Sequence, residues 1–473
     1  MPGAPPKPIV TSWDVFDTLI ARFVPNPHAV FQTVETNSNA PGFVRRRMDA
    51  QAALDRIGEP YVLHDIYRQM VKDGLTPQDA RQLIQAEIAV EHSTLFPIRR
   101  NVERVDSSDL IISDMYLSPE IISGILFQTC DLHLHRPIIR SNWGKHSGTI
   151  WPLVLDTYVI RKHVGDNPNS DQKVPGSFRI NCELARDSEF SAWERALHEA
   201  GLGHLAMIQR EVRLRMIPPD ATAFHHAVVG PYVTILVCFA MQLLHRFGRD
   251  SEFTFLSRSS DELARVFSSM FPDVPVRGLD ISRRLVADRR LDALFATGIN
   301  ADTVVVDMVG TGRSYFRFSE QNGRPERALI LFAFLDFLLL EAPDRAVADR
   351  RAAEGRLQHI CKISGTGAGH WCFEHLLQSH YPPVSGVTVD PASGGVVRVF
   401  GAPELDRTEA DLIGWKSHAV TQLIRTLRHR GMVDPGADAL SAIMLRALKT
   451  ICDNAAIMAP FTSFRAREAM DWA

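Results

Sequence analysis

The stretch "SWDVFDTLIA", residues 12–21, decides the fold of the N-terminal half of the chain. The apolar residues Ile9 and Val10 just before it predict a buried strand, and Asp14 and Asp17 stand near the end of that strand. Carboxylates are seldom buried without a partner, so their position needs a reason. The stretch is either a catalytic strand end or an ordinary turn.

The composition is that of a globular protein with two or three domains in its 473 residues. The formal charge of −3 and the lack of a nucleic-acid-binding motif give no reason to expect nucleic acid as a partner. Six cysteines are scattered without a Cys-X-X-Cys pair, which argues against a zinc site or a secreted disulfide scaffold. We expect a cytoplasmic protein, since the first ten residues also lack the apolar core of a signal peptide.

One apolar run, Ala227 to Leu244, approaches the length of a membrane span. It contains Gly230, Pro231 and Gln242, and histidines and an arginine flank it. These residues favour a buried core helix, and we expect no membrane span.

Residues 28–104 have the apolar spacing of helices almost throughout. Thr76 followed by Pro77 predicts the N-cap and the first residue of one helix. Because strand patterns lie on both sides, we expect this segment to be a helical insert.

Apolar strands alternate with helices in the rest of the chain. A first series holds "LIISDM", "PIIRS" and "HVGDN" with the downstream "FRIN", and a second holds "FTFLSRSSDELARVF", "TVVVDMVGTGRSYFRF" and "ALILFAFLDF". Such alternation is typical of α/β folds with a parallel sheet, in which ligands bind beyond the carboxyl ends of the strands. We predict two α/β domains, residues 8–205 and 225–473, and a linker at 206–224 that carries paired prolines.

Polar residues follow the expected strands of the first domain: Asp14 with Thr18, Ser113 with Asp114, Lys145, and Asp166 with Asp171. This set suits phosphoryl transfer. A carboxylate can act as the nucleophile, a hydroxyl and an ammonium can hold phosphate oxygens, and further carboxylates can bind Mg2+.

The order of these motifs resembles the haloacid dehalogenase (HAD) superfamily over residues 8–205. The shared pattern is an Asp with a Thr four positions on, a Ser at a strand end, a Lys, and a Gly-Asp followed by a second acid. The helical segment 28–104 resembles the cap that closes over the active site in that superfamily. The resemblance implies a Rossmann-like parallel sheet with a helical cap.

The resemblance also implies a role for each motif residue. Asp14 would be the nucleophile that forms an aspartyl-phosphate, while Ser113 and Lys145 would bind the transferring phosphoryl group. Mg2+ would be held by the carboxylates of Asp14 and Asp166 and by the backbone carbonyl of Phe16. Asp171 would support this metal site.

One position departs from the phosphatases of the superfamily. They usually carry a second Asp, two positions after the nucleophile, that protonates the leaving alcohol; here the residue is Phe16, which is aromatic as in the dehalogenases. Asp17 is the nearest substitute, although strand alternation would turn it to the opposite face, where it would only cap the turn. Three alternatives follow: a phosphatase whose acid is Asp17, Asp114, His146 or a cap residue, a dehalogenase-like hydrolase, and a degenerate binding domain. The two acids of the metal motif favour the first.

The helical insert carries two charge patterns, Glu87 with Glu91 on one helix face and the run Arg45–Arg47. We expect a solvated helix face. The alternative for the arginines is contact with a phosphorylated substrate.

The second domain has a candidate site in "TVVVDMVGTGRSYF", residues 303–316. A strand, an acid and a Thr-Gly-Arg-Ser loop before a helix resemble the phosphoribosyl pyrophosphate (PRPP) loop of type I phosphoribosyltransferases, and such a loop offers N–H groups to a phosphate. The resemblance implies that Asp307 contacts the ribose, that Arg258 lies near the pyrophosphate, and that the 5-phosphate is cradled by Thr311, Gly312, Arg313 and Ser314. The usual second acid is replaced by Met308, and the alternative is a tight turn without phosphate. Further basic residues follow Arg258 at Arg283, Arg284, Arg289 and Arg290.

Together the two resemblances imply a two-step ribofuranosyl transfer, similar to ribosylation modules of polysaccharide and antibiotic biosynthesis. PRPP-dependent transfer would place a 5-phosphoribosyl group on a hydroxylated acceptor, and the fused phosphatase would remove the 5-phosphate, with Mg2+ as cofactor. The alternatives are a stand-alone phosphatase or hydrolase of a small phosphorylated metabolite, and a degenerate scaffold in a biosynthetic complex. The partners we expect are small molecules, and the sequence is compatible with a homo-oligomer.

Overall fold

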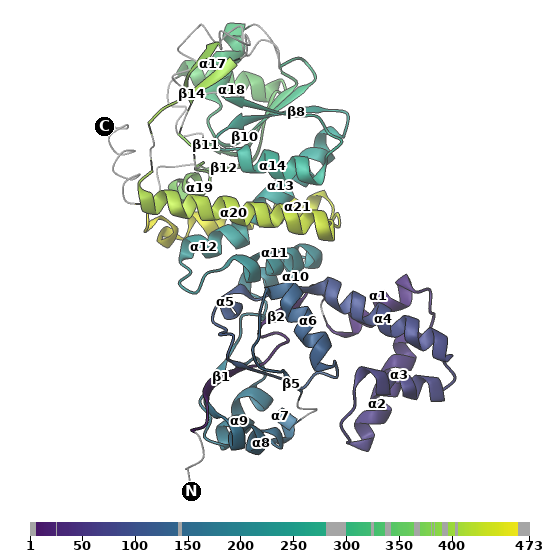
Figure 1. Ribbon diagram of the computed structural model, residues 1–473. Coiled ribbons are helices and arrows are strands. Elements are labelled where there is room, and N and C mark those ends of the chain that lie inside the picture. The colour runs from purple at the N-terminus through teal and green to yellow at the C-terminus, as the bar shows by residue number, and fades with distance from the viewer. Residues whose placement is uncertain are drawn as a thin grey trace. The chain divides into compact units, whose positions relative to one another are not determined.

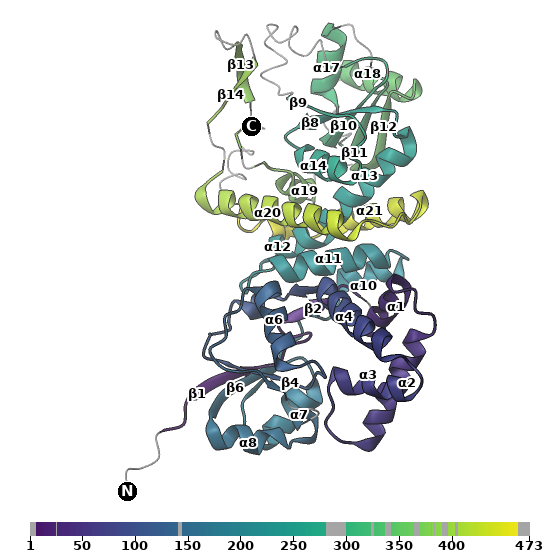
Figure 2. The same cartoon turned by 45° about the vertical axis from the view of Figure 1, so that its right-hand side comes forward.

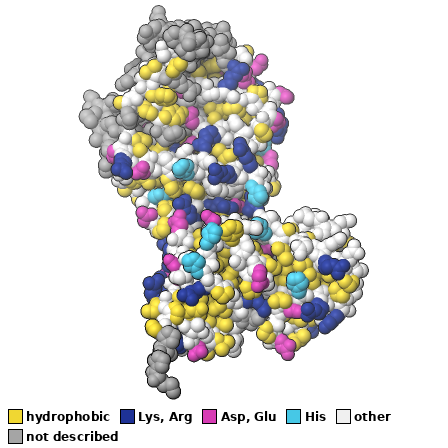
Figure 3. Space-filling view, viewed as in Figure 1, with side chains coloured by type: hydrophobic (Ala, Val, Ile, Leu, Met, Phe, Trp, Pro, Cys, Tyr) yellow, Lys and Arg dark blue, Asp and Glu magenta, His cyan; other side chains and the backbone are white. Residues whose placement is uncertain are grey.

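The computed structural model describes residues 6–24, 26–140, 144–280, 299–322, 326–335, 342–363, 369–379, 381–382, 384–389, 396–402 and 405–461. The chain forms two compact units, residues 1–191 with 213–219 and residues 192–212 with 220–473 (Figure 1). Each unit contains a five-stranded parallel sheet, so the predicted α/β class is confirmed. Basic and acidic side chains are interspersed on the face shown in Figure 3, in line with the formal charge of −3.

The sheet of the first unit has the strand order β5-β4-β1-β6-β7. Its strands pair in parallel and are β1 (Ile9–Trp13), β4 (Leu110–Ser113), β5 (Ile139–Arg140), β6 (Val159–Gly165) and β7 (Cys182–Leu184). The last strand begins after the predicted "FRIN", because Arg179 has a φ of 61°, which an extended strand does not allow. The strand order reverses at β1, which lies between β4 and β6. Open α/β sheets usually bind ligands at such a point.

Helices cover both faces of this sheet (Figures 1 and 2). One face carries α6 (Pro119–Cys130), and the other carries α7 (Gly144–Ser147), α8 (Ile150–Thr157) and α9 (Val174–Ser177). Side chains of β4 alternate between the two layers: Ile112 belongs to the same core cluster as Trp151 of α8, and Ile111 to that of Ile122 of α6. The core on both faces holds the strand ends in place.

The predicted helical insert is present between β2 (Ile20–Arg22) and β3 (Leu95–Pro97), which form an antiparallel pair at its base. Its helices are α1 (His28–Asn37), α2 (Phe43–Ile57), α3 (Leu63–Lys72) and α4 (Pro77–Thr94). Thr76 is the N-cap of α4, as predicted, and its side chain accepts a hydrogen bond from the N–H of Asp79 at 3.1 Å. The insert ends before residue 104, because the chain has by then returned to the main body through β3 and α5 (Arg99–Val102).

The sheet of the second unit has the order β12-β11-β10-β8-β9, again with parallel pairing. Its strands are β8 (Glu252–Ser257), β9 (Val276–Asp280), β10 (Thr303–Gly310), β11 (Ala328–Leu335) and β12 (Leu357–Ile363). The order reverses between β8 and β10. Helices on the two faces are α13 (Val233–Phe247) with α14 (Asp261–Met270), and α17 (Arg313–Asn322) with α18 (Ala342–Ala353) (Figure 2).

The apolar run at 227–244 lies within a helical stretch, Ala223–Phe247, that is long and apolar enough to cross a membrane. Its most apolar window has a mean hydropathy of 2.0, and 94% of that window is buried inside the protein. The stretch comprises α12 (Ala223–Ala227), a π-helical segment (Val228–Tyr232) and α13. Phe239 of α13 packs against Phe332 of β11, with ring centroids 5.4 Å apart, so this helix forms part of the core of the second unit.

The boundary between the units differs from the predicted linker at 206–224. Much of that segment belongs to α11 (Gly203–Met216), which follows α10 (Ala192–Glu199). Residues 192–212 group with the second unit, where Trp193 Nε1 donates to Thr234 Oγ1 at 2.9 Å and Gln209 Nε2 donates to the Gly230 carbonyl at 3.1 Å. The second unit ends with α19 (Gly369–Leu376), the hairpin β13 (Val384–Val389) and β14 (Val396–Phe400), then α20 (Arg407–Arg430) and α21 (Ala437–Cys452).

Candidate functional site

The motif residues of the first unit meet at the carboxyl edge of its sheet. Asp14 follows β1, Ser113 ends β4, Lys145 lies in α7, and Asp166 follows β6. Asp171 lies one turn later, in the π-helical segment Pro168–Lys173. These residues line one cavity of about 400 Å³, together with Phe16 and Asp17. The parallel sheet thus brings together every residue predicted for this site.

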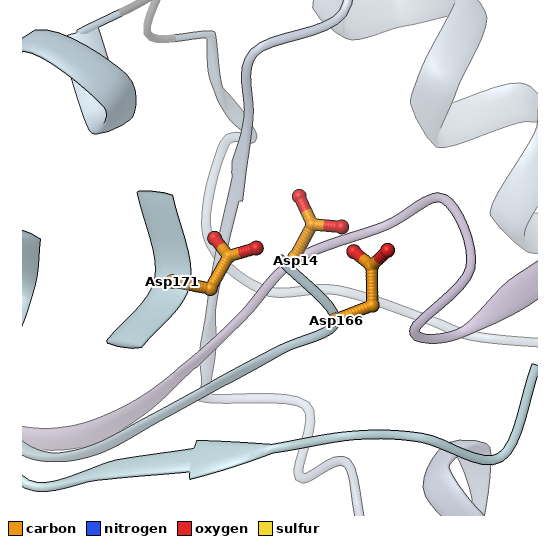
Figure 4. A group of neighbouring side chains, drawn as sticks. All are labelled: Asp14, Asp166 and Asp171. Atoms are coloured by element: carbon orange, nitrogen blue, oxygen red, sulfur yellow. The ribbon is translucent and has the colours of Figure 1, made fainter. Parts of the chain in front are cut away.

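Three carboxyl groups in the cavity lie close enough to share a cation. Asp14, Asp166 and Asp171 each offer an oxygen atom, and these atoms lie within 4.8 Å of one another. Figure 4 shows the three side chains, with Asp14 between the other two. Carboxylates at this separation repel each other unless a cation compensates them. The group could therefore hold a metal ion, and Phe16 in the same lining has a backbone carbonyl as a further predicted ligand.

Lys145 supplies the fixed positive charge of the site. Its side chain is buried, and its Nζ contacts Asp14 Oδ1 and donates to Asp171 Oδ1 at 2.7 Å. Thr18 Oγ1 donates to the other oxygen of Asp14, Oδ2, at 3.3 Å. An added Cβ at Gly165 would lie 2.4 Å from Asp171 Cγ, so only glycine leaves room for that carboxyl group. Contacts on both oxygens of Asp14 fix the orientation of its carboxyl group.

Burial shifts the ionisation of the three acids in different directions. It raises the pKa of Asp14 from 3.8 to about 6, against the opposing charge of Lys145. Burial and the neighbouring Asp14 and Asp17 raise the pKa of Asp166 to about 8. Burial also acts to raise the pKa of Asp171, but hydrogen bonds and charge from His163 and Lys145 outweigh it and the net shift is downward. Two of the three carboxyl groups thus ionise at an energetic cost that a bound cation would relieve.

Two residues behind the carboxylates, Ser12 and His163, were missed by the sequence analysis. His163 is fully buried, with its Nε2 3.1 Å from Asp171 Oδ1 and its Nδ1 2.8 Å from Ser12 Oγ. An ionised carboxylate only accepts hydrogen bonds, so Nε2 carries the proton and Nδ1 accepts from the Ser12 hydroxyl. The available signal was a histidine near the end of a predicted strand, two residues before Gly165.

Asp17 lines the cavity, where the predicted substitute acid would have to lie, and the alternative that strand alternation turns it to the opposite face does not hold. Strand β1 ends at Trp13, so its side-chain alternation does not extend to Asp17. Asp17 has a φ of 58°, and its N–H donates to the Ile20 carbonyl at 2.7 Å. The residue therefore closes a turn through its backbone and also presents its side chain to the cavity.

The other acid candidates are placed differently. Asp114 lines the cavity, where its two carboxyl oxygens accept hydrogen bonds from the N–H groups of Lys145 and His146, each at 3.3 Å. His146 is exposed, and its Nδ1 lies 3.2 Å from Asn169 Nδ2. Among the described residues of the lining, Asp17 and Asp114 are thus the two with carboxyl groups outside the metal-type group.

The expectation of a solvated helix face holds for Arg45 and Arg46, which are exposed, but is wrong for the two glutamates. Glu87 and Glu91 are 2% and 5% exposed. Arg47 donates to both carboxyl oxygens of Glu87 at 2.9 Å, and Arg22 Nε donates to Glu91 Oε1 at 2.7 Å. The glutamates face inward because each has a buried arginine to compensate its charge. Arg47 pairs with Glu87, whereas Arg45 in the same basic run is exposed.

The candidate residues of the second unit gather where its strand order reverses. Asp307 of β10 accepts hydrogen bonds from Ser259 Oγ, which follows β8, and from the Met308 N–H at 2.8 Å. Arg258 directly follows β8 and is partly buried. Burial raises the pKa of Asp307 to about 6, although its hydrogen bonds oppose the shift. An acid, hydroxyl groups and an arginine therefore meet at the usual ligand position of an open sheet.

The predicted phosphate loop lies at the start of α17, but several of its groups already have partners. Arg313 Nε contacts Asp344 Oδ2 of α18 at 2.6 Å, and Thr311 Oγ1 accepts from the Arg313 N–H at 3.2 Å. Gly312 has a φ of 75°, and an added Cβ would lie 2.8 Å from Phe316 Cζ, so packing alone requires glycine. Ser314 is partly buried in the first turn of α17. The arginines at 283, 284, 289 and 290 lie outside the described residues.

No known family model matches the chain, and neither does any curated protein. The first unit combines a buried aspartate, a lysine and a group of acids that could hold a cation in one cavity. This combination suits transfer of a phosphoryl group to the carboxylate.

Proposed function

We propose that the first unit is a Mg2+-dependent phosphohydrolase of the HAD type with Asp14 as its nucleophile. The observation that carries the proposal is the meeting of Asp14, Asp166, Asp171 and Lys145 in one cavity at the point where the strand order reverses. The donor set consists of carboxylate oxygens, which suit Mg2+ better than softer metals. When bound, Mg2+ would supply charge that reduces the repulsion between a phosphate and the carboxylate nucleophile.

Asp14 begins the reaction by attacking the phosphorus atom of the substrate. An aspartyl-phosphate forms while the bond between phosphorus and the leaving oxygen breaks. A pKa of about 6 leaves Asp14 largely ionised at neutral pH, and its contacts to Thr18 and Lys145 hold it in one orientation. Lys145 and Ser113 bind oxygens of the transferring group. Water then hydrolyses the aspartyl-phosphate, which releases phosphate and restores Asp14.

The leaving alcohol needs a proton, which Phe16 cannot donate. We assign this step to Asp17, whose side chain lines the cavity. Asp114 also lies in the lining, where its oxygens accept hydrogen bonds from two backbone N–H groups. Asp17 is the nearer of the two in sequence to position 16, where the phosphatases that the chain resembles usually carry their acid.

The test of the proposal is Mg2+-dependent release of phosphate from 4-nitrophenyl phosphate by the full chain. Turnover that requires Mg2+ and Asp14 supports the phosphohydrolase. A degenerate scaffold would show no turnover, and a dehalogenase-like enzyme would act on a carbon–halogen bond instead.

Mg2+ binding should strengthen between pH 6 and pH 8. The raised pKa values of Asp14 and Asp166 mean that the folded protein retains protons that the unfolded chain releases near 3.8, so ionisation of these two groups lowers stability as the pH rises. Mg2+ binds the ionised groups, so its stabilising effect grows over the same range. Thermal unfolding with and without Mg2+ at both pH values measures this, and a Tm shift that is as large at pH 6 as at pH 8 contradicts it.

His163→Leu should weaken Mg2+ binding and lower kcat by about 10- to 100-fold, because Asp171 loses the hydrogen bond that orients it. His163→Gln retains an N–H donor and should recover much of the loss. Trp151→Phe is the packing control, since Trp151 lies edge-on to the imidazole with centroids 5.0 Å apart and makes no hydrogen bond to it. Calorimetric Mg2+ titration checks the prediction. Equal losses in the Leu and Phe variants would assign His163 a packing role only.

We further propose that the second unit binds PRPP and transfers its 5-phosphoribosyl group to a hydroxylated acceptor. The bond between the ribose C1 and the pyrophosphate breaks, pyrophosphate leaves, and the acceptor oxygen bonds to C1 and loses its proton. The first unit then removes the 5-phosphate from the product. The specific observation in favour is the hydrogen bond between Ser259 and Asp307 where the strand order reverses between β8 and β10. An acid held there is suitably placed for ribose hydroxyls, and the start of α17 offers N–H groups to a phosphate.

Calorimetric titration with PRPP and Mg2+ should show saturable binding that Arg313→Ala weakens by about tenfold, the effect of losing one charged hydrogen bond to a phosphate. Arg317→Ala is the matched control, because Arg317 is exposed one turn later on α17 and lies 3.9 Å from the same Asp344. If the wild-type protein does not bind PRPP, the proposed transferase activity is excluded. Only the proposed phosphohydrolase of the first unit would then remain.

A further inference from the structure

We propose that the first unit acts on phosphomonoesters whose leaving group is a compact, uncharged ring, and that it discriminates against leaving groups that carry an anion. The inference rests on the proposed phosphohydrolase function. It concerns the part of the cavity beyond the residues that hold the phosphoryl group.

Aromatic side chains supply much of the wall in this part of the cavity. Phe16, Phe31, Tyr61 and Tyr116 all line it, two from the main body and two from the helical insert or its α2–α3 connection. Aromatic faces and edges pack well against flat rings and against the apolar faces of sugars. The total volume of about 400 Å³ is at the small end for ligand pockets, so it suits a single ring.

The arginine in this wall already has a carboxylate partner. Arg22 Nε donates to Glu91 Oε1 at 2.7 Å, and both side chains are buried. The Arg22 guanidinium also stacks on the Phe16 ring, 4.4 Å from its centroid. Its charge is therefore balanced within the protein, and an anionic ligand group would have to compete with Glu91 for it.

A second ion pair, formed by Arg47 and Glu87, lies behind the aromatic wall. Arg47 binds both oxygens of Glu87 at 2.9 Å, and its guanidinium lies 4.6 Å from the centroid of Phe31 and 5.0 Å from that of Tyr116. Tyr67 also donates to Glu87, at 2.8 Å. The pair supports the rings from the side away from the ligand without giving the cavity a net positive charge.

The rest of the lining reinforces this charge balance. Among the described lining residues, the Lys and Arg side chains are Lys145 and Arg22, and both are paired with carboxylates. Asp114 adds a carboxyl group, while His28 at the exposed side is the remaining basic residue there. An anionic leaving group would lose its hydration without gaining an unpaired cation.

The decisive experiment compares 4-carbamoylbenzyl phosphate with 4-carboxybenzyl phosphate, which have the same shape but differ by one negative charge. The full chain with Mg2+ should hydrolyse the carbamoyl ester with a kcat/KM at least about tenfold higher. Benzyl phosphate should also exceed ethyl phosphate, because only the former has a ring to pack against the aromatic wall. The ratio between two substrates is independent of the fraction of enzyme that is folded.

Glu91→Gln should lower the carbamoyl-to-carboxy ratio, because it leaves the charge of Arg22 without its partner. The double variant Arg22→Gln/Glu91→Gln removes both charges and should return the ratio to the wild-type value. Glu59→Gln, at an exposed position in the loop between α2 and α3, is the control and should leave the ratio unchanged.

The outcomes separate this inference from the function on which it rests. Equal kcat/KM values for the two esters, or a preference for the carboxy ester, would overturn the inference while the phosphohydrolase stands. A lack of turnover with both esters and with 4-nitrophenyl phosphate would overturn the phosphohydrolase itself.

Discussion

Asp14→Asn is expected to lower the rate of phosphate release by about 10⁴-fold or more, the size of loss seen when a nucleophile is removed. An amide has almost the same shape as the carboxyl group, but it cannot form the aspartyl-phosphate. Lys145 keeps one buried carboxylate partner, Asp171, at 2.7 Å. The variant therefore loses the reaction and not the fold.

We also predict how Asp14→Asn changes the thermal stability of the protein. Burial raises the pKa of Asp14 to about 6, so the ionised side chain is unfavourable at pH 8 without Mg2+. A neutral amide avoids this cost, and we expect the Tm of the ion-free variant to equal or exceed that of the wild type at pH 8. Phosphate release and thermal unfolding measure the two effects, with the exposed Asp156→Asn as a control for each. Activity retained in Asp14→Asn would exclude Asp14 as the nucleophile.

Asp17→Asn is expected to lower kcat by about 10²- to 10⁴-fold for an alkyl phosphate, the usual contribution of a general acid. The loss should be less than about tenfold for 4-nitrophenyl phosphate, since nitrophenolate leaves without being protonated. Asparagine tolerates the φ of 58° at this position, so the turn persists in the variant.

The size of the Asp17→Asn effect on each of the two substrates shows whether Asp17 acts as a general acid or only closes the turn. Asp114→Asn is the matched control, because Asp114 lines the same cavity but accepts two backbone N–H bonds. Its effect should be similar for both substrates. If Asp17→Asn also affects both substrates equally, Asp17 acts only by closing the turn.

Strong local signals made much of the fold predictable. Thr76 and Pro77 begin α4 because a hydroxyl N-cap and a proline at the first helical position satisfy the helix start within a few residues. The prediction that Asp14, Ser113, Lys145 and Asp166 meet needed only the parallel sheet, whose strands all end at one edge. Local periodicity and strand direction are encoded in short stretches of sequence.

Features that depend on where a strand or unit ends were less predictable. Side-chain alternation continued past Trp13, the last residue of β1, would turn Asp17 away from the site, but Asp17 lines the cavity. The expected linker at 206–224 includes most of α11, because Trp193 and Gln209 bond to residues 21 to 41 positions further along the chain. Contacts between residues so far apart along the chain produce no pattern in the local sequence from which they could be predicted.

The sequence by itself determined the two α/β units, the helical insert and the order of the acids, hydroxyl and lysine along the first sheet. The tertiary structure decided which charges face the cavity and which are paired. Glu87 is balanced by Arg47 across 40 positions, Lys145 reaches Asp14 across 131, and Ser12 meets His163 across 151. These pairings follow from how the helices and strands pack, and burial then sets the charge of each group through desolvation and its nearest partners.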